Sequence, residues 1–85
     1  MVEREIMYLL KGNIRHNLHR YTKVYYEVTY EDDTIYIVFT SKYGITFTYV
    51  EYNIYTQIRD GIDGETIAYR AVRQFKKYVN NQLFK

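Results

Sequence analysis

The sequence predicts an α+β domain in which a helix, a three-stranded antiparallel sheet and a second helix follow one another along the chain. Two observations support this prediction. The middle of the chain, 23–52, is rich in Tyr, Ile, Val, Thr and Phe, which favour strands, and turn-forming residues divide it at two places. The flanking segments carry apolar residues at helical spacing, so we expect both helices to cover one face of the sheet.

The length of 85 residues predicts a single domain over 1–85. The chain has no cysteine and only two histidines, so neither a disulfide nor a structural zinc site is expected to support the core. The core must therefore come from packing or be completed by a partner subunit.

The first helix is expected over 2–20, because four apolar residues recur on one helical face: Met7, Leu10, Ile14 and Leu18. Gly12-Asn13 is the weak point, since a glycine inside a helix costs about 1 kcal/mol relative to alanine. The sequence leaves open whether the helix continues through this pair or ends at Lys11, with a second short piece over 14–20.

Three strands are expected over 22–30, 34–41 and 45–52. In each of them a more apolar set of residues alternates with a set rich in Tyr and Thr, which is typical of a sheet with one covered and one solvated face. Gly44 is expected in the left-handed region of a hairpin loop. The other turn lacks glycine, so we expect Asp32 and Asp33 to hydrogen-bond the local backbone.

The connector over 53–64 is ambiguous. Residues 53–58 can extend the third strand, add a short edge strand or form one helical turn. The last helix is expected over 64–84, with Asp63 as its N-cap, because Ile67, Ala71, Phe75 and Val79 share one helical face.

Residues for catalysis are few. Ser41 is the only serine and lies in a predicted turn, while His16 and His19 lack a further ligand nearby. The glycines at 61–64 stand beside acidic residues and precede no Lys-Ser/Thr pair, so they do not match a phosphate-binding loop. We therefore expect no catalytic site, no metal site, no cofactor and no enzymatic activity.

Charge is segregated along the chain. Residues 1–23 carry five basic and two acidic side chains, residues 24–65 two and eight, and residues 66–85 five and none. Basic residues of the two helices form a candidate patch for phosphate or an acidic partner: Lys11, Arg15, Arg20, Arg70, Arg73, Lys76 and Lys77. The first hairpin turn forms a candidate acidic patch: Glu31, Asp32 and Asp33.

The solvated face of the sheet is a candidate interface, because exposed tyrosines bury a large area while few rotamers are frozen. Its core residues are expected to be Tyr25, Tyr36, Val38, Val50 and Tyr52, with Thr46 and Thr48 beside them and Glu27 and Glu51 at the border. We expect a protein partner here. A homodimer through this face, and DNA or RNA bound by the basic helices, are the alternatives.

The order of elements is similar to that of the double-stranded-RNA-binding domain over 7–84, and the segment GIDGETIAYRAV, 61–72, resembles the start of that family's last helix. That family has lysines at the start of this helix, where this chain has Glu65, Thr66 and Ile67. Its first hairpin loop reaches the RNA, whereas the loop here is acidic. The resemblance is therefore one of topology.

Small size, missing cysteine and a Tyr-rich mixed fold also resemble short phage-encoded proteins, including anti-CRISPR inhibitors of CRISPR nucleases. The abundance of Ile, Tyr, Asn and Lys beside just two alanines and no proline indicates an AT-rich genome. The resemblance implies a viral protein that inhibits nucleic-acid-acting host machinery from the host cytoplasm. The N-terminal segment predicts neither a signal peptide nor a membrane span, so no membrane partner is expected.

Overall fold

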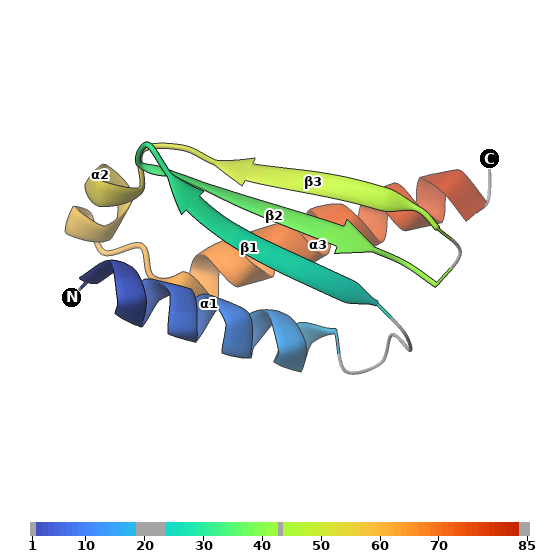
Figure 1. Ribbon diagram of the computed structural model, residues 1–85, viewed down its shortest axis with the longest axis horizontal. Coiled ribbons are helices and arrows are strands. Elements are labelled where there is room, and N and C mark those ends of the chain that lie inside the picture. The colour runs from blue at the N-terminus through green and yellow to red at the C-terminus, as the bar shows by residue number, and fades with distance from the viewer. Residues whose placement is uncertain (1, 19–23, 43, 84–85) are drawn as a thin grey trace.

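The computed structural model describes residues 2–18, 24–42 and 44–83. Its elements are, in order, α1 (Val2–Asn17), β1 (Tyr25–Glu31), β2 (Thr34–Thr40), β3 (Thr46–Glu51), α2 (Ile54–Arg59) and α3 (Gly64–Leu83). The strands form one antiparallel sheet of order β1-β2-β3. The two long helices, α1 and α3, lie side by side and cover the same face of the sheet (Figure 1). The predicted α+β fold is confirmed.

The first helix is continuous through Gly12 and Asn13, so it does not break at this pair. A Cβ at Gly12 would meet nothing within 4 Å, which leaves only the propensity cost of the glycine. The side-chain amide of Asn13 donates to the carbonyl of Leu9 at 2.8 Å, within the helix. α1 ends at Asn17, earlier than expected, and residues 19–23 lie outside the described part of the chain.

The strand predictions hold to within a few residues. Gly44 has a φ of 79°, as expected for a glycine in the left-handed region. The β1–β2 turn differs from expectation, because Asp32 and Asp33 both have positive φ, at 51° and 57°. This is the backbone of a type I′ turn, which matches the twist of a two-residue hairpin.

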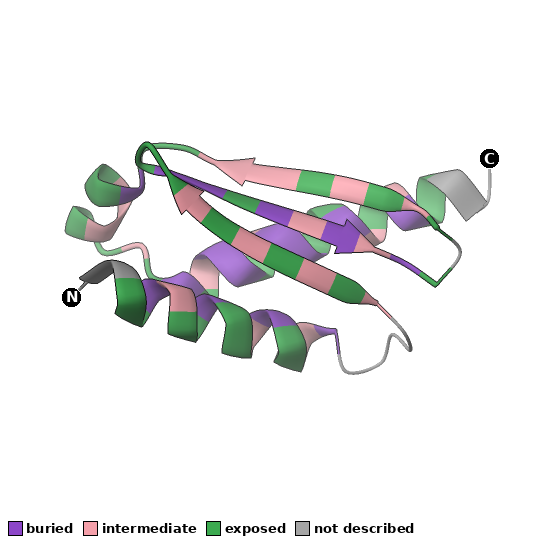
Figure 2. Ribbon diagram, in the orientation of Figure 1, coloured by how far each residue is buried: buried purple, intermediate pink, exposed green. Residues whose placement is uncertain are grey.

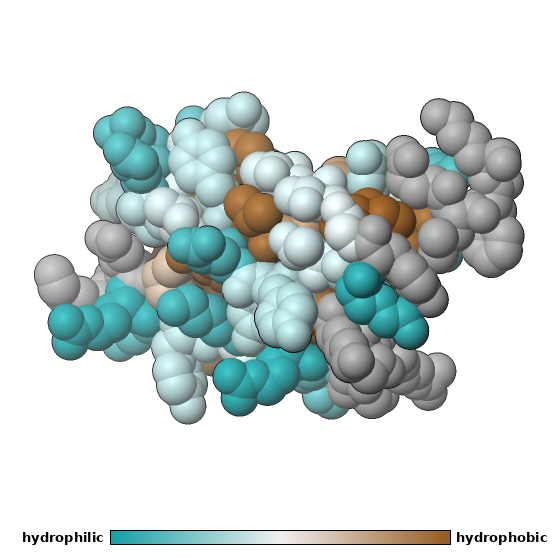
Figure 3. All heavy atoms as spheres, turned by 45° about the vertical axis from the view of Figure 1, so that its right-hand side comes forward, coloured by the Kyte–Doolittle hydropathy of each residue, from teal (hydrophilic) through white to brown (hydrophobic). Residues whose placement is uncertain are grey.

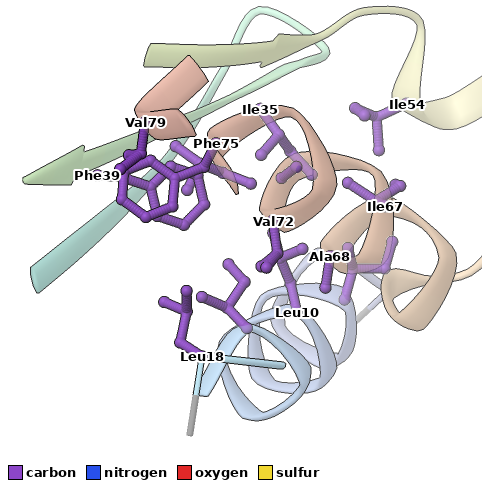
Figure 4. Packing of buried hydrophobic residues seen from close by; sticks show 14 residues of the cluster. Leu10, Leu18, Ile35, Phe39, Ile54, Ile67, Ala68, Val72, Phe75 and Val79 are labelled. Atoms are coloured by element: carbon purple, nitrogen blue, oxygen red, sulfur yellow. The ribbon is translucent and has the colours of Figure 1, made fainter. Parts of the chain in front are cut away.

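The connector forms a short helix, α2, and not a strand. Asn53 has a φ of 54°, which ends the extended backbone directly after Tyr52. The first residue of α2, Ile54, is fully buried and reaches the core (Figure 4). α2 therefore closes the end of the sheet from which β3 leaves (Figure 1).

The core lies between the sheet and the helix pair. Buried residues alternate along β2 and follow one side of each long helix (Figure 2). At its centre the rings of Phe39 and Phe75 stack, with centroids 4.7 Å apart (Figure 4). Phe47 lies beside Phe75 at 6.5 Å.

The crossing of α1 and α3 depends on a glycine. A Cβ placed on Gly64 would lie 3.1 Å from the Cβ of Leu9 and 3.2 Å from the carbonyl oxygen of Ile6. The buried first residue of α3 thus allows the helix backbones to approach closely. Immediately before it, Asp63 caps the helix as predicted, because its carboxylate accepts hydrogen bonds from the N–H and the hydroxyl of Thr66, both at 2.9 Å.

Candidate functional site

The uncovered face of the sheet is the most extended candidate site. We define the open sheet face as the outward residues of the strands: Tyr25, Glu27, Thr29, Tyr36, Val38, Thr40, Thr46, Thr48 and Val50. They alternate with the inward residues that contact the helices, as the banding of β1 and β3 shows (Figure 2). The structure thus places Tyr25, Tyr36, Val38 and Val50 together on one face, as expected.

The strand register arranges this face in rows. One row runs Thr29–Tyr36–Val50, the next Glu27–Val38–Thr48, and the third Tyr25–Thr40–Thr46. Glu27 is the charged residue in these three rows, and Glu31 follows on the same side of β1 at the hairpin tip. The outward residues of β2 and β3 are uncharged. Figure 3 shows the resulting mixture, in which small apolar areas lie among residues of intermediate hydropathy.

Tyr52 directly follows the last residue of β3 and lies outside the paired strand. Tyr52 is 62% exposed, against 69% for Tyr25 and 37% for Tyr36. Tyr55, at the start of α2, is exposed as well. Exposed tyrosines therefore continue from the sheet onto the end of the molecule where α2 lies.

Glu51 does not border the open sheet face, and that expectation was wrong. The register pairs Glu51 with Ile35, a residue of the covered face. Its carboxylate accepts hydrogen bonds from the hydroxyl of Tyr49 at 2.7 Å and the amide of Gln57 at 3.1 Å. Arg70 of α3 completes the cluster, 3.4 Å from Glu51.

This cluster joins three elements of the chain. Arg70 also donates to the side-chain oxygen of Gln57 at 3.1 Å, which ties α3 to α2 as well as to β3. Burial, and next the hydrogen bond to Glu51, raise the pKa of Tyr49 far above the ordinary value. The tyrosine is therefore a neutral donor across the physiological pH range. The hydrogen bonds within the cluster give these polar side chains a structural role, which is to connect β3, α2 and α3.

The residues of the candidate acidic patch at the hairpin tip have different surroundings. Asp33 accepts hydrogen bonds through one carboxylate oxygen, from the backbone N–H of Tyr55 at 2.9 Å and from the Tyr30 hydroxyl at 3.3 Å. The expectation that both aspartate side chains bond the local backbone is therefore wrong. Asp33 reaches α2, and Asp32 accepts the hydroxyl of Thr34 through its main-chain carbonyl. Glu31 and Asp32 are exposed at the same tip.

The basic residues do not gather as one uniform patch. Arg70 is held on the β3 side of α3 by Glu51 and Gln57. Arg73 and Lys77 are exposed on α3, and Lys11 and Arg15 are exposed on α1. Lys76 is half-buried, and Arg20 lies outside the described residues.

The structure does not bring the residues considered for catalysis or metal binding together within its described part. Ser41 is buried in its turn, where its hydroxyl oxygen accepts a hydrogen bond from the N–H of Ile45 at 3.2 Å. His16 is exposed on α1, and His19 lies outside the described residues. Within the described ranges, no three or more His, Asp or Glu side chains lie close enough together to hold a metal ion.

Comparison with models of known protein families, with curated proteins and with solved structures gave no significant match. Among the helices of the described residues, none is long and apolar enough to cross a membrane. Sequence reasoning missed a hollow between α1 and α3 that Tyr69, Arg73 and Lys76 line. Their i, i+4, i+7 spacing on one helix was the available signal.

Proposed function

We propose that this chain is a small non-enzymatic binding protein that docks its open sheet face onto a protein partner. The observation that supports the proposal is the composition of that face. Tyr25 and Tyr36 stand among threonines and valines, and the outward residues of β2 and β3 carry no charge. Aromatic residues with few charges at the centre are typical of protein interfaces.

The size of the face indicates how far the interface extends. Three strands of about seven residues offer a flat area on the order of 300 Å². Stable protein interfaces bury about 800 Å² on each partner. The partner must therefore also contact the neighbouring exposed residues, which are Tyr52, Tyr55 and the acidic hairpin tip at Glu31 and Asp32.

The acidic tip favours a partner with a basic surface, because carboxylates pair with Lys and Arg, and exposed tyrosines accept cation–π contacts. Enzymes that act on nucleic acids carry such surfaces. The proposed partner is accordingly a nucleic-acid-acting host enzyme, bound in the host cytoplasm by a phage-type inhibitor of the anti-CRISPR kind. The resemblance to short phage-encoded proteins supports the same partner class.

A cleavage assay tests this function. Purified CRISPR nucleases are incubated with their guide and target DNA, with and without the chain. We expect the chain to inhibit at least one of them, and Asp32→Asn to weaken inhibition. Asparagine also tolerates the left-handed backbone of Asp32, so this variant removes charge without straining the turn.

If the chain inhibits none of the nucleases tested, the inhibitor function is contradicted. Inhibition that Asp32→Asn leaves unchanged would remove the acidic tip from the interface. A dimeric mass at micromolar concentration, reduced to the monomer mass by Tyr36→Ala, would instead assign the open sheet face to self-association.

A further inference from the structure

A groove between α1 and α3 lies on the helix layer, away from the open sheet face. It consists of adjoining hollows of about 200 and 420 Å³. Tyr69 and Asn17 line both, so the hollows share a wall. The smaller one also has Val72, Arg73 and Lys76, and the larger one has Asn13, His16, Glu65 and Thr66. The larger hollow lies within the range of about 300–1,000 Å³ that is typical of small-ligand sites, and the smaller one adjoins it.

The groove has a charge gradient along α3. Arg73 and Lys76 stand at one end and Glu65 at the other, with about 12 Å of helix between Glu65 and Arg73. Arg73 forms no ion pair with any carboxylate in the described part of the chain, so its charge is uncompensated. An anionic group is therefore favoured at the Arg73 end and disfavoured at the Glu65 end.

Between these ends the lining suits a planar polar group. Tyr69 is 56% exposed and lines both hollows, so a planar group in the groove can stack on its ring. The amide nitrogens of Asn13 and Asn17 donate to the carbonyls of Leu9 and Asn13, at 2.8 and 2.7 Å. These bonds fix the amides and leave their oxygens with acceptor capacity.

We propose that this groove binds a nucleotide, with its phosphate at Arg73 and Lys76 and its base against Tyr69. The guanidinium of Arg73 can engage phosphate oxygens through more than one N–H, and base–tyrosine stacking tolerates any base. The same chemistry is presented by a free nucleotide and by one unit of a single-stranded nucleic acid. The site is separate from the proposed protein interface and does not depend on it.

Titration of ¹⁵N-labelled chain with adenosine monophosphate, followed by NMR, tests the site. Chemical-shift changes are expected at backbone amides over 13–17 and 65–77, with millimolar affinity or better. Arg73→Ala and Tyr69→Ala should each weaken binding about fivefold or more. Lys77→Ala and Tyr8→Ala are the matched controls, because both residues are exposed and line neither hollow. Their affinities should stay within about twofold of the wild type.

A second titration, with a short single-stranded oligonucleotide at low and high salt, identifies the source. Tighter, salt-sensitive binding at the same amides assigns the groove to single-stranded nucleic acid, and equal affinity assigns it to free nucleotides. The proposal is overturned if neither probe shifts these amides, or if Lys77→Ala weakens binding as much as Arg73→Ala. Inorganic phosphate that binds as tightly as the nucleotide would overturn the base contact at Tyr69.

Discussion

The carboxylate of Asp33 accepts a hydrogen bond from the backbone N–H of Tyr55 at 2.9 Å, across 22 residues of sequence. The backbone carbonyl of Asp33 accepts a second one from the N–H of Ile54 at 3.1 Å. Asn53, the residue before α2, provides no side-chain cap, and the tip of the β1–β2 hairpin instead satisfies the N–H groups of Ile54 and Tyr55. The acidic tip therefore has two roles: Asp33 holds the start of α2, and Glu31 and Asp32 leave their charges exposed.

Removing this contact should loosen α2. Asp33→Ala is expected to lower the free energy of unfolding by about 0.5–2 kcal/mol more than Asp32→Ala does. Asp32 is the matched control because it has the same left-handed backbone, and only its main-chain carbonyl is bonded by Thr34. Urea unfolding monitored by circular dichroism measures both values. Equal losses for the two variants would mean that the Asp33 carboxylate contributes nothing to stability.

The glycines of the two long helices should respond in opposite directions. Gly64→Ala is expected to destabilise the chain by about 1–3 kcal/mol, because the new methyl group meets the backbone of α1 at Ile6 and Leu10. Gly12→Ala is expected to stabilise it by up to about 1 kcal/mol, because the site is helical and open. Thermal and urea unfolding of both variants test the helix crossing. A stabilising Gly64→Ala would contradict the close approach.

Tyr49 should produce an alkaline loss of stability. Burial and the hydrogen bond to Glu51 raise its pKa in the folded chain. A raised pKa means that the contribution to stability is complete below the unfolded pKa of about 10 and falls as the pH rises above it. Above pH 10, the wild type should therefore lose stability more steeply than Tyr49→Phe. Parallel curves for wild type and variant would show that Tyr49 ionises equally in both states.

Asp63 should make the stability of the folded chain depend on pH in the acidic range. Hydrogen bonds from Thr66 hold the pKa of the Asp63 carboxyl below its ordinary value. Its contribution is therefore present above the unfolded pKa of about 3.9 and disappears as the pH falls through the folded pKa. Asp63→Ala should destabilise the chain at neutral pH, and the difference from the wild type should shrink in acid. A difference independent of pH would contradict a role for the charged cap.

Local patterns were enough to predict much of this fold. The alternation of Ile35, Ile37 and Phe39 with Tyr36 and Val38 fixes which side of β2 is buried, because one strand has a period of two residues. The capping role of Asp63 follows in the same way from its position before a helix. Each of these features depends on neighbours within a few residues.

Contacts between distant segments were not predictable in this way. Arg70 reads as one of several basic residues on a helix, and its pairing with Glu51, 19 residues away, depends on how α3 crosses β3. Gly64 reads as a turn residue, although its close approach to Leu9 sets the helix crossing. The sequence pattern also left the course of residues 53–58 open, because Ile54 bonds Asp33, which is 21 residues earlier in the chain, and is buried in a core built from distant segments.

The central claim is that the open sheet face binds the protein partner, and site-specific blocking tests it most directly. The chain has no cysteine, so a single one introduced at Thr48 or at Tyr8 can be labelled selectively with a bulky polyethylene glycol maleimide. Both positions are exposed, the first on the open sheet face and the second on α1. We predict that the label at Thr48→Cys abolishes binding to a nuclease that the chain inhibits, while the label at Tyr8→Cys leaves binding unchanged. Full binding by the chain labelled at Thr48→Cys would contradict the claim.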